Sequence, residues 1–312
     1  MKPFAFVFPG QGAQSVGMLD AWGDHPAVRE VLAESAQALG EDIGRLIREG
    51  PAQALELTTN TQPVMLAAAI ACYRAWRAEG APEPSALAGH SLGEYTALVA
   101  AGALTLSDAL SLVRFRAHAM QQAVPVGAGA MAAILGLEPA AVVDGCARAA
   151  ADAGGVVSAA NFNDPKQTVI SGSKAAVDKA CEILKGMGAK RALPLAVSAP
   201  FHCALMRPAA DALRERLAAV AIAAPRIPVV NNIDVAAASE PAAIRDALVR
   251  QAYGPVRWVE VVQALRARGL THVLECGPGR VLTGMVKRID AEAVTAGVFD
   301  PASLRDALAV LV

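Results

Sequence analysis

The stretch Ala88-Gly89-His90-Ser91-Leu92-Gly93-Glu94-Tyr95 contains the pattern Gly-x-Ser-x-Gly. It follows the apolar run Ser85–Ala88 and precedes a helix-prone run from Glu94 to Ala101, so we expect Ser91 on a tight strand-to-helix turn. The glycines let the two backbone segments approach closely, and the start of the helix directs N–H groups and a positive dipole toward Ser91. The pattern therefore indicates a nucleophile elbow for acyl transfer, although it also occurs by chance in glycine-rich chains.

The composition describes a folded chain with a large core. Of the 312 residues, 54% are hydrophobic and 18% are charged, which allows one large α/β domain or two domains. The formal net charge of -1 argues against a nucleic-acid-binding protein, because such proteins need a strongly basic surface for the phosphates. The five cysteines show no Cys-x-x-Cys spacing, so we expect neither a disulfide framework nor a zinc site.

No stretch of the sequence predicts an association with membranes. The apolar run Pro63–Tyr73 ends at Arg74 and is shorter than the roughly 18 residues that a membrane-spanning helix needs. The apolar segment Phe4–Phe8 runs directly into Pro9-Gly10 and is too short for a signal peptide. We therefore expect a cytoplasmic protein.

The order of elements on both sides of the elbow is that of an α/β fold. Strand Phe4–Phe8 leads into the loop Pro9–Gln14, which is either an ordinary first turn or a loop whose N–H groups face Ser91. Helices are expected at about 26–39, 43–47, 62–79, 107–123, 205–219, 242–251 and 256–267 and near 281, and strands at 228–232, 271–276 and 294–298. Residues 1–126 and 198–312 should therefore form a large α/β-hydrolase-like subdomain with a parallel sheet.

Residues 127–197 have a different order of elements. The pattern predicts strand 130–135, helix 139–153, strands 156–161 and 168–171, helix 175–187 and strand 191–197. This βαββαβ order is that of the ferredoxin-like unit. We therefore expect a smaller ferredoxin-like subdomain that is inserted into the larger one.

The second half of this insert is locally basic. This segment contains six basic and three acidic residues, which gives it a local charge of +3. The basic residues are Lys166, Lys174, Lys179, Lys185, Lys190 and Arg191. Such a face either docks an acidic partner or is an ordinary solvated helix surface.

Two further residues are candidates for chemistry. Within helix 107–123, Arg116 falls on the apolar face, whereas Arg114 projects to a different side. An unpaired buried charge costs on the order of 3–5 kcal/mol, so Arg116 requires either an internal carboxylate or a substrate carboxylate. His202 follows Pro200-Phe201 at a strand-to-helix junction, where it is either a general base for Ser91 or a structural histidine.

Taken together, these motifs resemble those of the malonyl-CoA:acyl carrier protein transacylase family. They occur in the family's order as Phe8-Pro9-Gly10-Gln11-Gly12-Ala13-Gln14, Gly89-His90-Ser91-Leu92-Gly93-Glu94-Tyr95, Arg116, Asn161-Phe162-Asn163, His202-Cys203-Ala204-Leu205-Met206, Val230-Asn231-Asn232 and Gly277-Pro278-Gly279. One such motif can be accidental, but the ordered set covers essentially the whole chain. The resemblance implies an acyltransferase that moves the malonyl group from malonyl-CoA to the phosphopantetheine thiol of acyl carrier protein for fatty acid biosynthesis.

The resemblance implies a chemical role for four positions. Ser91 attacks the malonyl thioester, and His202 takes its proton and later gives it to the departing sulfur. The backbone N–H groups of Gln11 and Leu92 stabilise the tetrahedral oxyanion, an arrangement in which one lost donor typically costs about 2.7–4 kcal/mol. The reaction then proceeds through a malonyl-Ser91 ester with ping-pong kinetics.

Three more assignments rest on the same resemblance. Arg116 pairs with the free carboxylate of malonate. The histidine of this family is oriented by a glutamine or a backbone carbonyl, and Gln251 occupies the matching position, so no acidic third member is expected. Phe201 stands where many bacterial relatives have serine, whereas malonyl-selective polyketide acyltransferases often have phenylalanine. Its bulk should exclude an α-methyl group, which predicts malonyl over methylmalonyl.

The implied partner is acyl carrier protein, with the basic face of the insert as a possible docking surface. Neither a metal ion nor a redox cofactor is expected. A monomer is expected as well, because no heptad pattern or exposed apolar helix suggests otherwise.

Three alternatives remain open at this point. An ordinary serine hydrolase uses the same elbow, but it should carry an acidic triad member and has no use for Arg116. A discrete polyketide acyltransferase or the malonyl-loading subunit of malonate decarboxylase shares most of the motifs. The non-enzymatic alternative is a catalytically silent module that binds carrier protein. Such a module would not need the full set of site residues.

Overall fold

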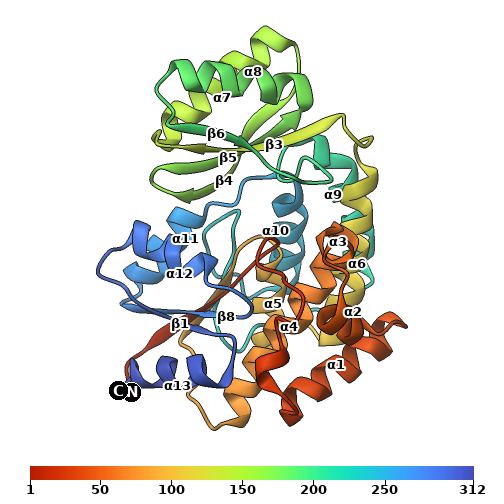
Figure 1. The fold of residues 1–312 in the computed structure, drawn as a ribbon, viewed down its shortest axis with the longest axis vertical. Coiled ribbons are helices and arrows are strands. Elements are labelled where there is room, and N and C mark those ends of the chain that lie inside the picture. The colour runs from red at the N-terminus through yellow and green to blue at the C-terminus, as the bar shows by residue number, and fades with distance from the viewer.

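Two separate β-sheets organise the chain in the computed structural model, which describes residues 1–312 (Figure 1). The larger sheet has the strand order β7-β2-β1-β8-β9, and every neighbouring pair runs parallel. Its strands are β1 (Phe4–Phe8), β2 (Ala86–Gly89), β7 (Val229–Val230), β8 (His272–Cys276) and β9 (Val294–Val298). The predicted parallel sheet is confirmed.

Helices cover both faces of this sheet, and the side chains of β1 are buried on both of them. Phe4, Phe6 and Phe8 point into a core of 59 buried residues with α4 and α6, whereas Ala5 and Val7 point into a core of 16 with α11 and α12. A strand that is buried on both faces carries apolar residues at every position, as β1 does.

The helices around the larger sheet lie close to the predicted positions, except that the short helix Ala52–Glu56 was not predicted and the helix expected at 62–79 begins at Thr58. They are α1 (Pro26–Leu39), α2 (Ile43–Glu49), α3 (Ala52–Glu56), α4 (Thr58–Ala78), α5 (Gly93–Ala100), α6 (Leu106–Gln122), α9 (Arg207–Ala218), α10 (Pro241–Tyr253), α11 (Trp258–Ala267), α12 (Val281–Ile289) and α13 (Pro301–Ala309), with short 3₁₀ helices at Asp20–Trp22 and Ala204–Met206. None of them combines the length and the apolar character that crossing a bilayer requires.

The smaller sheet is antiparallel and has the order β4-β5-β3-β6. Its strands are β3 (Gly129–Leu135), β4 (Val157–Asp164), β5 (Gln167–Ser173) and β6 (Arg191–Pro194), with α7 (Pro139–Ala153) and α8 (Lys174–Gly186) between them. Counted along the insert, the strand order is 2-3-1-4, so the first and third strands lie in the centre. This is the arrangement of the ferredoxin-like unit, and the predicted fold class is confirmed.

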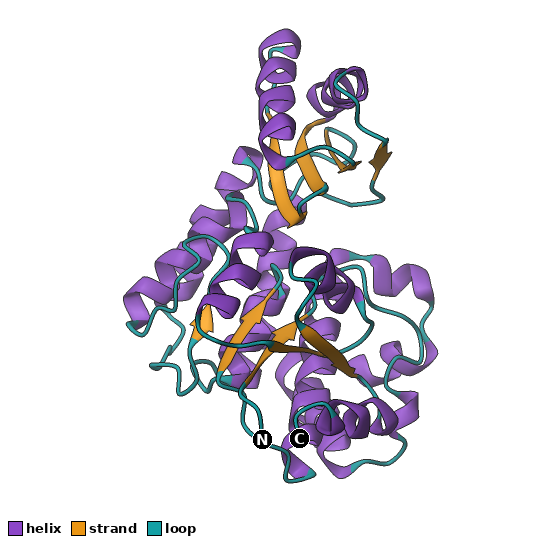
Figure 2. Cartoon of the chain, turned by 90° about the vertical axis from the view of Figure 1, so that its left-hand side faces the viewer, coloured by secondary structure: helices purple, strands orange, loops and turns teal.

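The two faces of the smaller sheet have different neighbours. Helices α7 and α8 pack on one face around Val142, Val177 and Leu184. The opposite face, with Met131 and Val169, is directed toward the larger subdomain (Figure 1). Figure 2 shows the same division from the side, with both termini at the far end of the larger subdomain.

Two predicted strands are shorter than the pattern suggested. The strand expected at 191–197 ends at Pro194, although the N–H of Leu195 still donates to the carbonyl oxygen of Met131 in β3 at 2.9 Å. The strand expected at 228–232 keeps only Val229 and Val230. Asn231 and Asn232 leave the sheet and use their side chains to bind backbone groups of neighbouring loops.

Candidate active site

The elbow around Ser91 is a tight turn between β2 and α5. Ser91 has a φ of 52°, a left-handed conformation that is rare for residues other than glycine. A Cβ on Gly89 would lie 1.9 Å from the carbonyl oxygen of Gly93, and a Cβ on Gly93 would lie 2.1 Å from the carbonyl oxygen of Phe8. Only glycine fits at both positions, which is the physical reason for the Gly-x-Ser-x-Gly pattern.

His202 reaches the Ser91 hydroxyl from the segment between β6 and α9. Its Nε2 lies 2.7 Å from Ser91 Oγ, and its Nδ1 lies 3.0 Å from the carbonyl oxygen of Gln251 and 3.2 Å from that of Gly254. Because carbonyl oxygens only accept, Nδ1 carries the proton, and the lone pair of Nε2 faces the Ser91 hydroxyl. Burial and then the nearby charge of Arg116 lower the pKa of His202 to about 3, so the imidazole is a neutral acceptor.

Arg116 lies beside the same hydroxyl and is only 3% exposed. Its Nη1 donates to Gln62 Oε1 at 2.7 Å, and its Nη2 donates to Gln251 Oε1 at 3.2 Å and to Ser91 Oγ at 3.3 Å. The guanidinium also lies over the ring of Tyr95, 5.4 Å from its centroid.

No carboxylate of the protein forms an ion pair with Arg116, and its Nε–H has no partner. Of the two partners that the sequence left open, the internal carboxylate is therefore excluded. Arg114, two residues away, pairs with Glu41 at the surface, as its position on the helix predicted. A buried guanidinium that only neutral groups contact is suited to an anionic ligand.

Two backbone N–H groups beside Ser91 have no acceptor in the protein. They belong to Gln11 and Leu92, the latter buried at the start of α5. The loop of Gln11 is held close to the elbow, since a Cβ on Gly10 would lie 2.7 Å from the carbonyl oxygen of His90. Buried N–H groups are nearly always paired, so the free donor of Leu92 is suited to a ligand oxygen, and the N–H of the exposed Gln11 is a second free donor in the same cleft.

These groups line a cleft of about 570 Å³ between the two subdomains. The larger subdomain contributes the loop Pro9–Gln14, the elbow and Arg116, and the smaller one contributes the sheet face with Met131 and Val169. Phe201, next to His202, also lines the cleft. A flexible acyl thioester with an apolar arm and a polar end fits such a lining.

Comparison with known proteins agrees with this chemistry. A family model described as "Acyl transferase domain" matches residues 5–297. The chain belongs to the acyl transferase domain family.

The relatives within this family cover the chain from end to end. The malonyl CoA-acyl carrier protein transacylase of Salmonella typhimurium (strain LT2) is 51% identical over 309 residues, which are 99% of each chain. The crystal structure of an acyl-carrier-protein S-malonyltransferase from Burkholderia pseudomallei is 66% identical, with a TM-score of 0.97 over 99% of this chain and 100% of that one. A malonyl-transacylase solved in complex with a type II PKS acyl-carrier protein is 49% identical, with a TM-score of 0.97 over 99% and 100%.

Gln251 holds parts of the candidate site in two ways. Its backbone carbonyl accepts from His202, as described above, so the main chain orients the imidazole. Its side chain donates from Nε2 to the carbonyl oxygen of Ser91 and to Glu94 Oε2, both at 3.0 Å, and accepts from Arg116. The position matched to Gln251 in the sequence therefore lies at the site.

Asn232 is a site residue for which the sequence indicated no role. Its Oδ1 accepts from the N–H of Ser91 at 2.7 Å, and its Nδ2 donates to the carbonyl oxygen of Gly89 at 2.7 Å. The side chain is fully buried and holds the strained elbow from both ends. The tandem asparagines after β7 are the signal that could have indicated it, since amide side chains often bind backbone groups at turns.

The smaller subdomain contacts the elbow through β4. Asn163 Oδ1 lies 2.8 Å from Nε2 of His90, the residue before Ser91. Backbone hydrogen bonds of 2.8 and 2.9 Å also join Val256 to Ala160 and Phe162. The two walls of the cleft are thus connected directly at the elbow.

The site contains no cluster of metal-binding side chains. No group of three or more His, Cys, Asp or Glu side chains lies close enough together to hold a metal ion. All five cysteines have free thiols, and four of them are buried.

Proposed function

We propose that the protein transfers the malonyl group from malonyl-CoA to the phosphopantetheine thiol of acyl carrier protein. One observation carries the proposal. The Ser91 hydroxyl lies 2.7 Å from a neutral His202 and 3.3 Å from Arg116, a buried guanidinium without a carboxylate partner. A nucleophile beside an unoccupied carboxylate-binding group is suited to a dicarboxylic half-thioester. The names of the close relatives, given above, support this substrate.

In the first half-reaction Ser91 is acylated. His202 Nε2 takes the hydroxyl proton as Oγ attacks the thioester carbonyl carbon. The N–H groups of Gln11 and Leu92 donate to the oxygen that becomes negative in the tetrahedral intermediate. The carbon–sulfur bond then breaks, the proton passes from His202 to the departing coenzyme A sulfur, and a malonyl-Ser91 ester remains.

In the second half-reaction the carrier thiol takes the place of coenzyme A. His202 accepts the proton of the phosphopantetheine thiol, and the sulfur attacks the ester carbonyl in the same oxyanion site. The carbon–oxygen bond breaks, and Ser91 recovers the proton from His202. These steps use only the side chains and backbone groups of this chain and require neither a metal ion nor a redox cofactor.

Arg116 binds the free carboxylate of the malonyl group in both half-reactions. One Nη1 hydrogen has no acceptor in the protein, and Nη2 faces the Ser91 oxygen on which the acyl group forms. Charge-assisted hydrogen bonds to a carboxylate are about twice as strong as neutral ones. A monocarboxylic acyl group such as acetyl leaves the guanidinium without this partner. We therefore expect a preference for malonyl-CoA over acetyl-CoA.

The carrier protein is expected to approach the mouth of the cleft. Of the six basic residues that the sequence indicated, Lys174, Lys179 and Lys185 lie on α8, which covers the face of the smaller sheet opposite the cleft (Figure 1). The first two pair with acidic neighbours on that helix, as Lys166 does with Glu138 in the loop before α7, so the position of α8 is what sets these three apart. We therefore narrow the proposed docking surface to the sheet end that carries the other three, Lys166, Lys190 and Arg191.

This sheet end lies beside the cleft. Gln167, which pairs with Leu135 in β3, lines the cleft, and Leu135 also pairs with Arg191 in β6. A carrier protein bound there can direct its flexible arm toward Ser91. We expect a monomer in the cytoplasm, as the sequence suggested.

A direct assay tests the proposed function. The purified protein is incubated with malonyl-CoA and holo acyl carrier protein, and malonylated carrier protein is measured by mass spectrometry. Rapid formation of malonyl carrier protein supports the proposal. Release of free malonate at a rate that exceeds transfer would contradict it and favour a hydrolase. Parallel assays with fatty acid and type II polyketide carrier proteins identify the preferred acceptor.

A further inference from the structure

Glu94 is a buried carboxyl group that the mechanism above does not use. It is 2% exposed and lies at the start of α5, three residues after Ser91. Its Oε2 accepts from the N–H of Asn232 at 2.8 Å and from Gln251 Nε2 at 3.0 Å. Burial raises the pKa of Glu94 to about 7, so the group remains inside the protein at a cost in free energy.

The contact with Gln251 determines which way this amide points. Its Nε2 faces two oxygens, those of Ser91 and Glu94, and its Oε1 faces the Nη2 of Arg116. The reversed amide would place oxygen against both oxygens and N–H groups against a cation, so all three contacts would become repulsive. Glu94 therefore helps to fix the acceptor that holds Arg116.

The contact with Asn232 acts on the elbow itself. The N–H of Asn232 donates to Glu94, and the Asn232 side chain holds the N–H of Ser91 and the carbonyl oxygen of Gly89. Glu94 thus fixes the residue that stabilises the left-handed conformation of Ser91. Both partners of Glu94 contact groups of the reaction site, whereas Glu94 contacts neither the Ser91 hydroxyl nor His202.

We propose that Glu94 is a positioning residue for the reaction at Ser91, acting through Asn232 on the elbow and through Gln251 on Arg116. This inference rests on the proposed acyl transfer. Glu94 acts as an acceptor in this role, and either protonation state leaves Oε2 able to accept.

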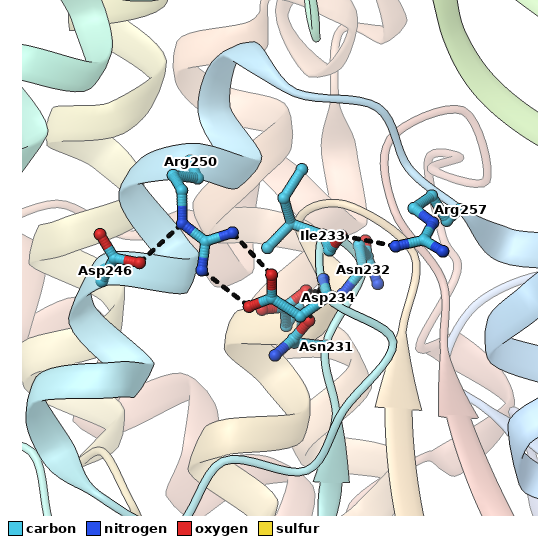
Figure 3. A network of polar contacts seen from close by, with 8 residues as sticks. Asn231, Asn232, Ile233, Asp234, Asp246, Arg250 and Arg257 are labelled. Atoms are coloured by element: carbon cyan, nitrogen blue, oxygen red, sulfur yellow. Dashed lines mark hydrogen bonds and ion pairs between the residues drawn. The ribbon is translucent and has the colours of Figure 1, made fainter.

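A network of ion pairs at the surface also holds the loop after β7. Arg250 donates from Nη1 and Nη2 to the two carboxylate oxygens of Asp234, both at 2.7 Å, and from Nε to Asp246 at 2.6 Å (Figure 3). Arg250 precedes Gln251 on α10, and Asp234 follows Asn232 in the loop after β7. The loop and the helix are therefore joined at the surface by this ion pair and in the interior by Glu94.

Three substitutions at Glu94 separate positioning from folding. Glu94→Gln keeps an oxygen that can accept both bonds, Glu94→Asp withdraws the carboxyl by one methylene, and Glu94→Ala removes it. The measurement is the rate constant of malonyl-Ser91 formation at saturating malonyl-CoA, by rapid quench and mass spectrometry, on protein whose fold is verified by circular dichroism. A misplacement of about 1 Å typically costs about 100-fold in rate, so we expect that loss in Glu94→Ala and about 10-fold in Glu94→Asp. Glu94→Gln should stay within about fivefold of wild type.

Glu275 provides the matched control. It is also a fully buried carboxyl that accepts two hydrogen bonds, from the N–H and hydroxyl of Thr283, and it contacts none of the groups above. Glu275→Ala should lower the melting temperature but keep acylation within about threefold of wild type.

The outcomes are distinguishable. Wild-type acylation rates in folded Glu94→Ala or Glu94→Asp would overturn the inference, and so would an equal loss in Glu275→Ala or in Glu94→Gln. If Glu94→Ala does not fold, Glu94→Asp and Glu94→Gln decide alone. An unacylated wild type would instead overturn the proposed function, on which the inference depends.

Discussion

Replacing Arg116 by methionine should abolish the preference for malonyl-CoA. Methionine has a similar length and no charge, so it fills the space beneath Tyr95 and offers nothing to a carboxylate. The guanidinium is 3% exposed and its protein partners are the oxygens of Gln62, Gln251 and Ser91, all uncharged. In the account above, the malonyl carboxylate is the anion that completes this site.

The expected loss follows from the burial of this pair. Removing one partner of a buried ion pair typically costs about 3–5 kcal/mol. Since about 1.4 kcal/mol corresponds to a factor of ten, kcat/KM for malonyl-CoA should fall roughly 100- to 5,000-fold. Acetyl-CoA has no carboxylate to lose, so its kcat/KM should change by less than about tenfold.

The assay measures initial rates of Ser91 acylation with each thioester. Arg114→Met is the matched control, because Arg114 lies on the same helix but pairs with Glu41 away from the cleft. It should leave both rates unchanged. If Arg116→Met keeps the malonyl preference of the wild type, or if both donors lose activity equally, the assignment of Arg116 as the carboxylate-binding group is refuted.

Three further predictions concern the elbow, the base and the specificity. Gly93→Ala should lower the free energy of unfolding by about 3 kcal/mol or more in urea titrations, because its Cβ would lie 2.1 Å from a main-chain oxygen of the first strand. Gly186→Ala has no atom within 4 Å of the new Cβ, so it should not lower the free energy of unfolding in this way. Equal stability of the two variants would contradict the argument from the close contact. Because the pKa of His202 is lowered to about 3, acylation of Ser91 should stay nearly constant from pH 8 to pH 5. An ordinary histidine pKa would reduce the rate about 30-fold at pH 5, and such a decrease would refute the neutral imidazole. Phe201→Ser should raise methylmalonyl transfer relative to malonyl about tenfold in a competition assay, and an unchanged ratio would remove Phe201 from the specificity argument.

The elements that the sequence predicted well are those with a local signal. The elbow depends on two glycines within two residues of Ser91, and the structure shows the close contacts that require them. Helical periodicity predicted that Arg116 lies on the apolar face of α6, and in the structure the residues of that face are buried. Local pattern also separated the two subdomains, because the order of strands and helices changes at the insert.

The partners of the site residues could not be predicted in this way. Glu94 and Asn232 are 138 positions apart in the sequence, and Gln251 and Ser91 are 160 apart. No periodicity relates residues at such distances, so the sequence marked both Glu94 and the asparagines after β7 as parts of motifs but indicated no role for them. For the same reason, helical position alone left the partner of Arg116 open, although it showed that one was needed.

The sequence could not locate the docking surface on one face of the smaller subdomain for a related reason. Counting charges along the chain grouped six basic residues, but the fold puts three of them on α8, on the far side of the smaller sheet. Sequence distance therefore did not indicate which face of the subdomain each lysine occupies.

The intact mass of the protein after brief mixing with malonyl-CoA, measured for the wild type and for Ser91→Ala, tests acyl transfer through Ser91. We expect the wild type to gain the mass of one malonyl group and Ser91→Ala to gain none, although it still binds malonyl-CoA. Adding holo acyl carrier protein should return the wild type to its original mass. A wild type without an adduct, or an adduct that persists in Ser91→Ala, would contradict acyl transfer through Ser91.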